Sequence, residues 1–223
     1  MPLPMNNKEI ARKAIVEQGL LPLFFHEDAD VSLQVVRSLY SAGVRVLEYT
    51  NRGPAALANY RYLMKEVQTE MPNLQLGIGT VKTLQEAQDF LAAGAHFVVC
   101  PVVDQAVGSL VHEAGLLWIP GCLTPTEINV GHQHGAEIIK LFPANILGPS
   151  YVSAVKELFP GQLFLPTGGV EIEEENMKQW FEAGVCAVGM GSKLISKALL
   201  EQRDYARLSA LTSGVLELIA RCR

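Results

Sequence analysis

The segment 135–143, GAEIIKLFP, places a lysine, Lys140, near the end of a short apolar run. Gly135 and Pro143 bound that run, which predicts a buried strand. An ammonium group in a buried strand must be paired, must reach water, or must lose its proton, because burial disfavours the charged form. A neutral amine is a nucleophile toward carbonyl carbon. The alternative is a lysine whose stem lies in the wall while its ammonium reaches solvent.

The predicted strand that holds Lys140 belongs to a series. Five times a helix-like segment ends in a glycine that a strand-like run follows, in SAGVRVLE, AAGAHFVV, EAGLLWIP, QHGAEIIK and EAGVCAVG. Such a glycine suits the left-handed residue that ends a helix. Three more apolar runs, at 20–25, 74–78 and 163–166, have strand character. Eight runs separated by helical patterns predict an α/β fold, a (β/α)8 barrel forming one domain over residues 1–223.

The helical segments carry start signals of their own. The segment 1–19 predicts an N-terminal helix that closes the barrel, and 204–219 predicts a last amphipathic helix. The expected caps, including two pairs with capping-box spacing, are Asn7, Asp30, Thr83 with Glu86, and Thr124 with Glu127.

The repeat also aligns positions on different strands. Counting five residues from the glycine gives Glu48, Val99, Lys140 and Gly189 in the second, fourth, sixth and eighth runs. Alternate strands of such a barrel contribute one interior layer of side chains. Glu48 and Lys140 are therefore expected to project inward near the C-terminal mouth, as the acid/base and the nucleophile that imine chemistry needs. The alternative is a buried structural ion pair.

Residues after the strands suggest how a substrate is held. Arg52 closely follows the second strand, so its guanidinium can fork onto a carboxylate at the mouth; a salt bridge at the rim is the alternative. Glycine turns after the seventh and eighth strands leave backbone N–H groups uncovered next to expected helix starts, which predicts a site for a phosphate or carboxylate tail. Its residues are Gly168, Gly169, Gly191 and Ser192. Turns without any ligand are the alternative.

Composition excludes several classes of protein. The net charge is −5 with no basic cluster, so no nucleic-acid partner is expected. The first ten residues lack an apolar core, and the apolar runs are far shorter than the about 20 residues of a membrane span. We therefore expect a cytoplasmic protein with no membrane partner. The scattered histidines and cysteines predict neither a metal site nor disulfides.

Six motifs together carry a family resemblance: LEYTNRG, GIGTV, IPGCLTPTE, IIKLFPA, LPTGGV and GMGS. Their order and spacing, from about residue 20 to 194, resemble those of the 2-keto-3-deoxy-6-phosphogluconate (KDPG) and 4-hydroxy-2-oxoglutarate (KHG) aldolases. The resemblance implies a class I aldolase on a (β/α)8 barrel, without metal or cofactor and usually a homotrimer. The sequence departs from the family at two places. Many members have an arginine near the position of His26, and many have SPG where this chain has Cys100, Pro101 and Val102.

The resemblance assigns residues and a reaction. Lys140 matches the Schiff-base lysine and Glu48 the general acid/base. The expected substrate-binding residues are Arg52, Thr80, Pro101, Phe142 and Thr167. The implied reaction cleaves a 2-keto-3-deoxy sugar acid, expected to be 6-phosphorylated, to pyruvate and an aldehyde such as glyceraldehyde 3-phosphate. Open alternatives are cleavage of KHG to pyruvate and glyoxylate, an aldolase for 2-dehydro-3-deoxy-6-phosphogalactonate, a phosphate-binding epimerase or isomerase, and a non-catalytic sugar-acid binder.

Overall fold

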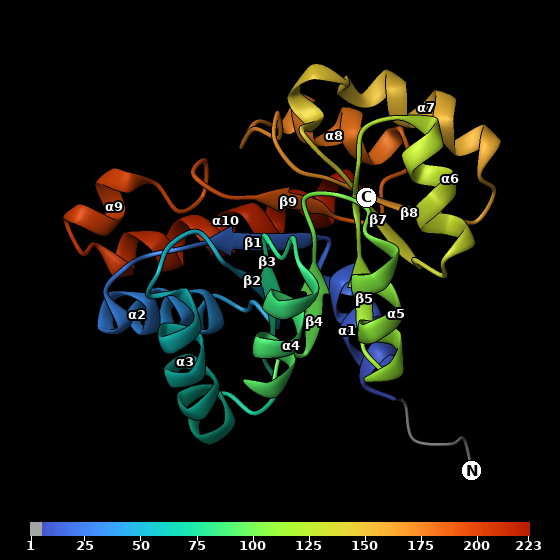
Figure 1. Cartoon of the computed structure of the whole chain (residues 1–223). Helices are drawn as coiled ribbons and strands as arrows, with labels where there is room; N and C mark the ends of the chain where they lie inside the picture. Colours follow the sequence, from blue (N-terminus) through green and yellow to red (C-terminus); the bar gives the residue numbers. More distant parts are fainter. Residues whose placement is uncertain (1–5) are drawn as a thin grey trace, which may run out of the picture.

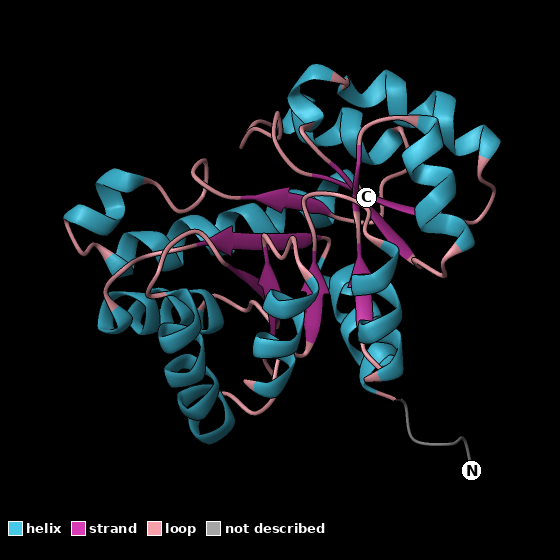
Figure 2. Cartoon of the chain, in the orientation of Figure 1, coloured by secondary structure: helices cyan, strands magenta, loops and turns pink. Residues whose placement is uncertain are grey.

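Parallel strands form the centre of the molecule and helices lie outside them (Figures 1 and 2). The computed structural model describes residues 6–223, so residues 1–5 of the predicted N-terminal segment lie outside the described part. The strands are β1 (Leu20–Phe24), β2 (Val46–Thr50), β3 (Gln75–Gly79), β4 (Phe97–Val99), β5 (Leu117–Ile119), β6 (Gly121–Cys122), β7 (Ile138–Leu141), β8 (Leu163–Pro166) and β9 (Val188–Met190).

The strands close into a barrel at two junctions. One sheet has the order β5-β4-β3-β2-β1-β9 and the other β6-β7-β8. β5 and β6 are one run divided at Pro120, which has no N–H to donate to a neighbouring strand. A parallel bridge between Thr167 and Gly189 joins the end of β8 to β9. The predicted (β/α)8 barrel is therefore confirmed, with nine strand labels for eight strand positions.

The helices follow the strands in alternation. They are α1 (Asn7–Gln18), α2 (Ala29–Ser41), α3 (Ala56–Glu70), α4 (Leu84–Ala92), α5 (Gln105–Glu113), α6 (Pro125–Gln133), α7 (Gly148–Leu158), α8 (Glu174–Glu182), α9 (Lys197–Glu201) and α10 (Tyr205–Cys222), with a short 3-10 turn η1 (Ala144–Ile146) after β7. The five glycines of the repeat have left-handed φ angles and follow helices as predicted: Gly43, Gly94, Gly115, Gly135 and Gly184.

Apolar side chains pack in two layers. The inner one fills the barrel with alternate residues of the strands, such as Val46, Phe97 and Ile138, and includes Ala11 and Ile15 of α1. The outer one lies between the strands and the surrounding helices. Each large side chain buried in this way stabilises the fold by about 1.5–3 kcal/mol. Val46 and Ile138 each lie two residues before Glu48 and Lys140 on the same strands, so those two polar side chains lie on the C-terminal side of this apolar layer.

Two expected helix caps were wrong and two were confirmed. Asn6 rather than Asn7 caps α1, since its side chain accepts a hydrogen bond from the Glu9 N–H at 2.9 Å. Asp28 rather than Asp30 caps α2 for the same reason. Each helix starts earlier than predicted because an earlier polar residue has its side-chain oxygen within reach of the amides two or three residues on. The capping boxes at Thr83 and Thr124 are both formed.

Candidate active site

A buried lysine and a buried carboxylate face one another inside the barrel. Lys140 lies on β7, in register with Gly121 of β6 and Leu165 of β8, and Glu48 lies on β2, in register with Leu23 of β1. The Lys140 Nζ is 3.6 Å from the Glu48 Oε1, and the two residues are 5% and 1% exposed. This separation is short enough for an ion pair and too long for a strong hydrogen bond. The repeat therefore correctly placed the two groups together.

The Glu48 carboxyl group is held without a hydrogen-bond donor. Within residues 6–223 neither of its oxygens has a hydrogen-bond partner. Burial raises the pKa of Glu48 above its usual value of 4.5, and the positive charges of Lys140 and Arg52 oppose that shift. A buried carboxyl group with a raised pKa and uncommitted oxygens is suited to accepting and returning protons.

Gly79, at the end of β3, supplies the space that Glu48 occupies. A Cβ at Gly79 would overlap the Glu48 carboxylate and lie 2.6 Å from its Cγ. Gly77, two residues earlier on the same face, makes similar room for the ring of Phe97. Sequence reasoning missed both roles. The available signal was the period of two in GIG, which puts both glycines on one face of a strand.

A buried hydroxyl group follows β8, and an aromatic ring lies near Lys140. Thr167 is 7% exposed, and its Oγ1 has no hydrogen-bond partner in the described chain. A Cβ at Gly189 would overlap that hydroxyl, so the glycine of β9 leaves room for it. The ring of Phe142 lies with its centroid 5.5 Å from the Lys140 Nζ. A buried polar atom with no partner is costly, and a bound substrate can satisfy it.

An open pocket of about 230 Å³ lies at the mouth. Of the predicted site residues it brings together Arg52, Phe142, Thr167, Gly168, Gly169, Gly191 and Ser192. Gly168 and Gly169 have left-handed φ angles of 93° and 71°. The backbone N–H groups of Gly168, Gly169 and Ser192 have no acceptor among residues 6–223. The turns are not at helix starts as expected, since α8 begins at Glu174 and α9 at Lys197.

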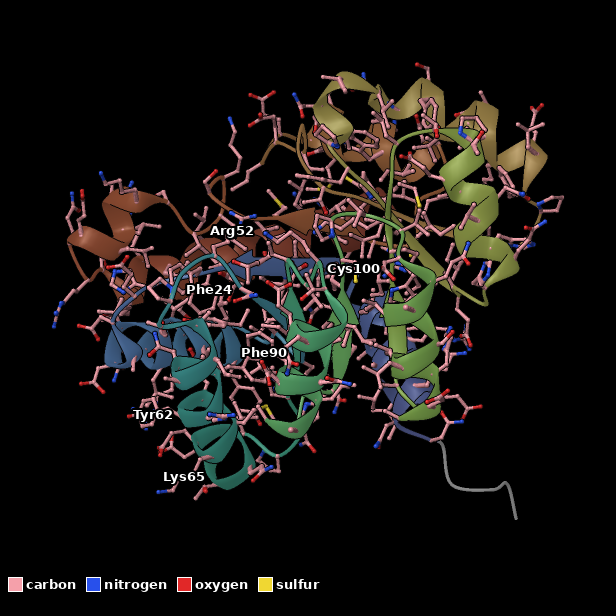
Figure 3. All side chains as sticks on the ribbon, in the orientation of Figure 1. Phe24, Arg52, Tyr62, Lys65, Phe90 and Cys100 are labelled. Atoms are coloured by element: carbon pink, nitrogen blue, oxygen red, sulfur yellow. The ribbon has the colours of Figure 1, made fainter. Side chains whose placement is uncertain are left out.

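Arg52 lines this pocket and is exposed, and its guanidinium makes no salt bridge within residues 6–223. Figure 3 shows Arg52 and Cys100 at the same edge of the sheet, where β2 and β4 end, with Tyr62 and Lys65 outside it on α3. An unpaired guanidinium at the mouth is suited to a carboxylate or phosphate.

Thr80 and Pro101 lie beyond the residues that line this pocket. Thr80 follows β3 and has a left-handed φ of 61°, which is unfavourable for a β-branched residue. Such strain is often found at functional sites. Pro101 follows β4, and its backbone lies against Gly121 so closely that a Cβ there would be 2.5 Å from the Pro101 oxygen. Thr80 follows β3, whose neighbour β2 carries Glu48, and Pro101 lies against Gly121 of β6, whose neighbour β7 carries Lys140.

Other features of the described residues bear on the site's chemistry. Residues 6–223 contain no cluster of three or more His, Cys, Asp or Glu side chains placed to hold a metal. Across the same residues, no helix combines the length and the apolar character needed to cross a membrane. Cys100 lies close to the site, and burial raises the pKa of its thiol to about 12, so it is not a nucleophile at neutral pH.

The fold and the site define a class: a (β/α)8 barrel whose mouth holds an amine opposite a proton-accepting carboxyl group. Residues 11–211 match the family described as KDPG and KHG aldolase. The chain belongs to the KDPG and KHG aldolase family, whose members are carbon–carbon lyases.

Individual relatives agree with this assignment. The KHG/KDPG aldolase of Escherichia coli strain K12 is 30% identical over 216 residues, which is 96% of this chain and 98% of the relative. A solved 4-hydroxy-2-oxoglutarate/KDPG aldolase from TTHB1 is 32% identical, with a TM-score of 0.78 over 97% of this chain and all of its own. KDPG aldolase of Legionella pneumophila, with pyruvate captured as a covalent carbinolamine, is 25% identical, with a TM-score of 0.82 over 91% and 96% of the two chains.

Proposed function

We propose that this chain cleaves a 2-keto-3-deoxy sugar acid, phosphorylated at C6, into pyruvate and glyceraldehyde 3-phosphate through an imine on Lys140. The reaction begins when the Lys140 amine adds to the C2 keto group and water leaves. Glu48, 3.6 Å from the amine, is the nearest carboxylate in the site and is suited to taking up the proton that the lysine must release.

The resulting iminium draws electrons from the C3–C4 bond. That bond breaks, its electron pair moves toward the nitrogen to give an enamine, and the C4 hydroxyl proton passes to Glu48. The aldehyde then leaves, the enamine gains a proton at C3, and water releases pyruvate and the free amine. The Thr167 hydroxyl, which is buried and has no hydrogen-bond partner within residues 6–223, is suited to hydrogen-bonding the substrate's oxygens beside the reacting carbons.

The substrate's two ends are assigned to different parts of the mouth. Arg52 and Thr80 are assigned to the 2-oxo acid carboxylate, which they would align for bond cleavage. Pro101 and Phe142 form apolar walls. The free amides at Gly168, Gly169 and Ser192, with Gly191, are assigned to the distal phosphate, because unpaired N–H groups in a left-handed turn form an anion site.

The proposal rests on the buried Lys140–Glu48 ion pair, in which the carboxyl group accepts no hydrogen bond from residues 6–223. Pyruvate release from KDPG, followed with lactate dehydrogenase and NADH, tests it. We expect the wild-type chain to be active, and Lys140→Ala to lose activity beyond detection. Full activity in Lys140→Ala refutes the mechanism, and a wild-type chain inactive on every phosphorylated and unphosphorylated 2-keto-3-deoxy acid tried refutes the function.

One observation favours KHG as a second candidate substrate. Four carboxylates follow the Gly169 turn within a few residues: Glu171, Glu173, Glu174 and Glu175. Their negative charge opposes a phosphate at that turn more strongly than the distal carboxylate of KHG, which carries a smaller negative charge. The KHG reaction would release glyoxylate with pyruvate by the same steps, so a comparison of kcat/KM for KHG and KDPG decides between the two.

The proposal includes a cytoplasmic homotrimer, which the family resemblance implies. Large apolar side chains are exposed in loops after β4 and β7, with Val102 at 49%, Phe142 at 36% and Ile146 at 65%. Exposed apolar groups gathered on one end of a barrel are suited to contact between subunits. Light scattering during size-exclusion chromatography tests the trimer, and a monomeric mass contradicts it.

A further inference from the structure

An ion pair links the two glycine turns at the mouth. The Lys193 Nζ lies 2.8 Å from the Glu171 Oε2, and Lys193 also lines the pocket with Arg52 and Ser192. Glu171 follows β8 and Lys193 follows β9, so the pair crosses from one turn to the other. Both side chains remain partly exposed, at 37% and 59%, and either can exchange its partner for a ligand.

The loop that carries Glu171 is held firmly in place. The Glu171 N–H donates to the Asn176 Oδ1 at 2.9 Å, and Asn176 Nδ2 and Trp180 Nε1 each reach the Gly169 carbonyl at 3.4 Å. The backbone at Glu171 is therefore fixed, and its carboxylate is held by the ion pair with Lys193. Within residues 6–223, the salt-bridge partner of the Lys193 Nζ is Glu171.

We propose that Glu171 sets the charge preference of the pocket by holding Lys193 away from the distal anion of the substrate. This inference rests on the proposed aldolase function and deepens it. With the pair intact, the positive charge of Lys193 is neutralised, and a distal phosphate is bound by the backbone amides of the two turns. A phosphate that engages Lys193 must first displace the Glu171 carboxylate, whereas a substrate with an uncharged tail meets no such competition.

The quantity to measure is a ratio: kcat/KM for 2-keto-3-deoxy-6-phosphogluconate divided by kcat/KM for 2-keto-3-deoxygluconate. Glu171→Gln frees Lys193 and is expected to raise the ratio by about three- to ten-fold, since one charge acts on a nearby dianion in a solvent-exposed site. Lys193→Gln leaves Glu171 unopposed and is expected to lower it by a similar factor. The double variant restores the neutral balance and is expected within about two-fold of wild type.

Two controls separate charge from structural damage. Glu182→Gln removes a carboxylate from the other end of α8, where Glu182 pairs with Lys178 at 3.7 Å, and its ratio should equal that of wild type. The effects at Glu171 and Lys193 should shrink between about 0.01 M and 1 M salt, because screening shortens the range of surface charges. Equal ratios in all variants, or single variants that shift the ratio in the same direction, overturn the inference.

A measurement without turnover keeps the inference distinct from the function. If wild type cleaves neither compound, the proposed function fails, and thermal stabilisation by inorganic phosphate then decides the inference. Ligands that bind the folded state raise its melting temperature. We expect the phosphate-induced rise to be largest in Glu171→Gln and smallest in Lys193→Gln. The reverse order, or equal rises in both variants, overturns the inference.

Discussion

Gly79→Ala perturbs the site with a single methyl group. The added Cβ overlaps the Glu48 carboxylate and lies 2.6 Å from its Cγ, so the whole acid side chain must move. Glu48 is 1% exposed, so protein atoms enclose its carboxylate. Overpacking of this kind destabilises a protein by about 1–3 kcal/mol. A displaced general acid/base lowers kcat by about 10²- to 10⁴-fold.

The assay pairs urea unfolding with pyruvate release. Gly214→Ala is the matched control, because a Cβ there meets nothing within 4 Å and the residue lies on α10. Alanine in a helix interior is favoured over glycine by about 1 kcal/mol, so the same substitution should stabilise the chain and leave its activity intact. Combining Gly79→Ala with Glu48→Ala should give a smaller loss of stability than the sum of the two single losses.

Normal activity and stability in Gly79→Ala would refute the reasoning, because Glu48 would then have room that the structure does not provide. Additive losses in the double variant would contradict the direct contact. A loss of stability with unchanged kcat would separate the packing role of Gly79 from the acid/base role of Glu48.

Three further outcomes follow from the site. Thr80→Gly relieves a left-handed φ of 61° and should raise the free energy of unfolding by about 1 kcal/mol while raising the KM for the keto acid. The raised pKa of Glu48 means that its carboxylate is protonated at a higher pH than a free glutamate, so kcat/KM should fall on the acid side with a midpoint above 4.5; a midpoint at or below 4.5 contradicts the burial argument. Brief iodoacetamide treatment of the native protein at pH 8 should label Cys222 first, since burial raises the pKa of the other three thiols to about 12; earlier labelling of Cys100, Cys122 or Cys186 contradicts this.

The barrel was predictable because its signals are local and repeated. A glycine that ends each helix and an apolar run that follows it fix both the order of the elements and the phase of each strand. That phase put Glu48 and Lys140 on the same interior layer, and the two lie 3.6 Å apart. Capping boxes were equally local, since a threonine and a glutamate three residues apart contain the whole interaction.

What was missed depends on contacts between distant segments. The need for glycine at Gly79 comes from Glu48 on the neighbouring strand. The Glu171–Lys193 pair joins loops that are adjacent only once β8 and β9 are side by side. The cap errors at Asn7 and Asp30 have a simpler origin, because neighbouring polar residues offered more than one possible cap.

Hydride trapping shows whether Lys140 forms an imine with a 2-oxo acid. The chain is incubated with pyruvate and sodium borohydride, digested, and mapped by mass spectrometry. Reduction of the imine should add the mass of pyruvate less one oxygen atom to the peptide that contains Lys140, and Lys140→Ala should acquire no such label. A label on a different lysine, or none in a wild-type chain that cleaves its substrate, would contradict the account.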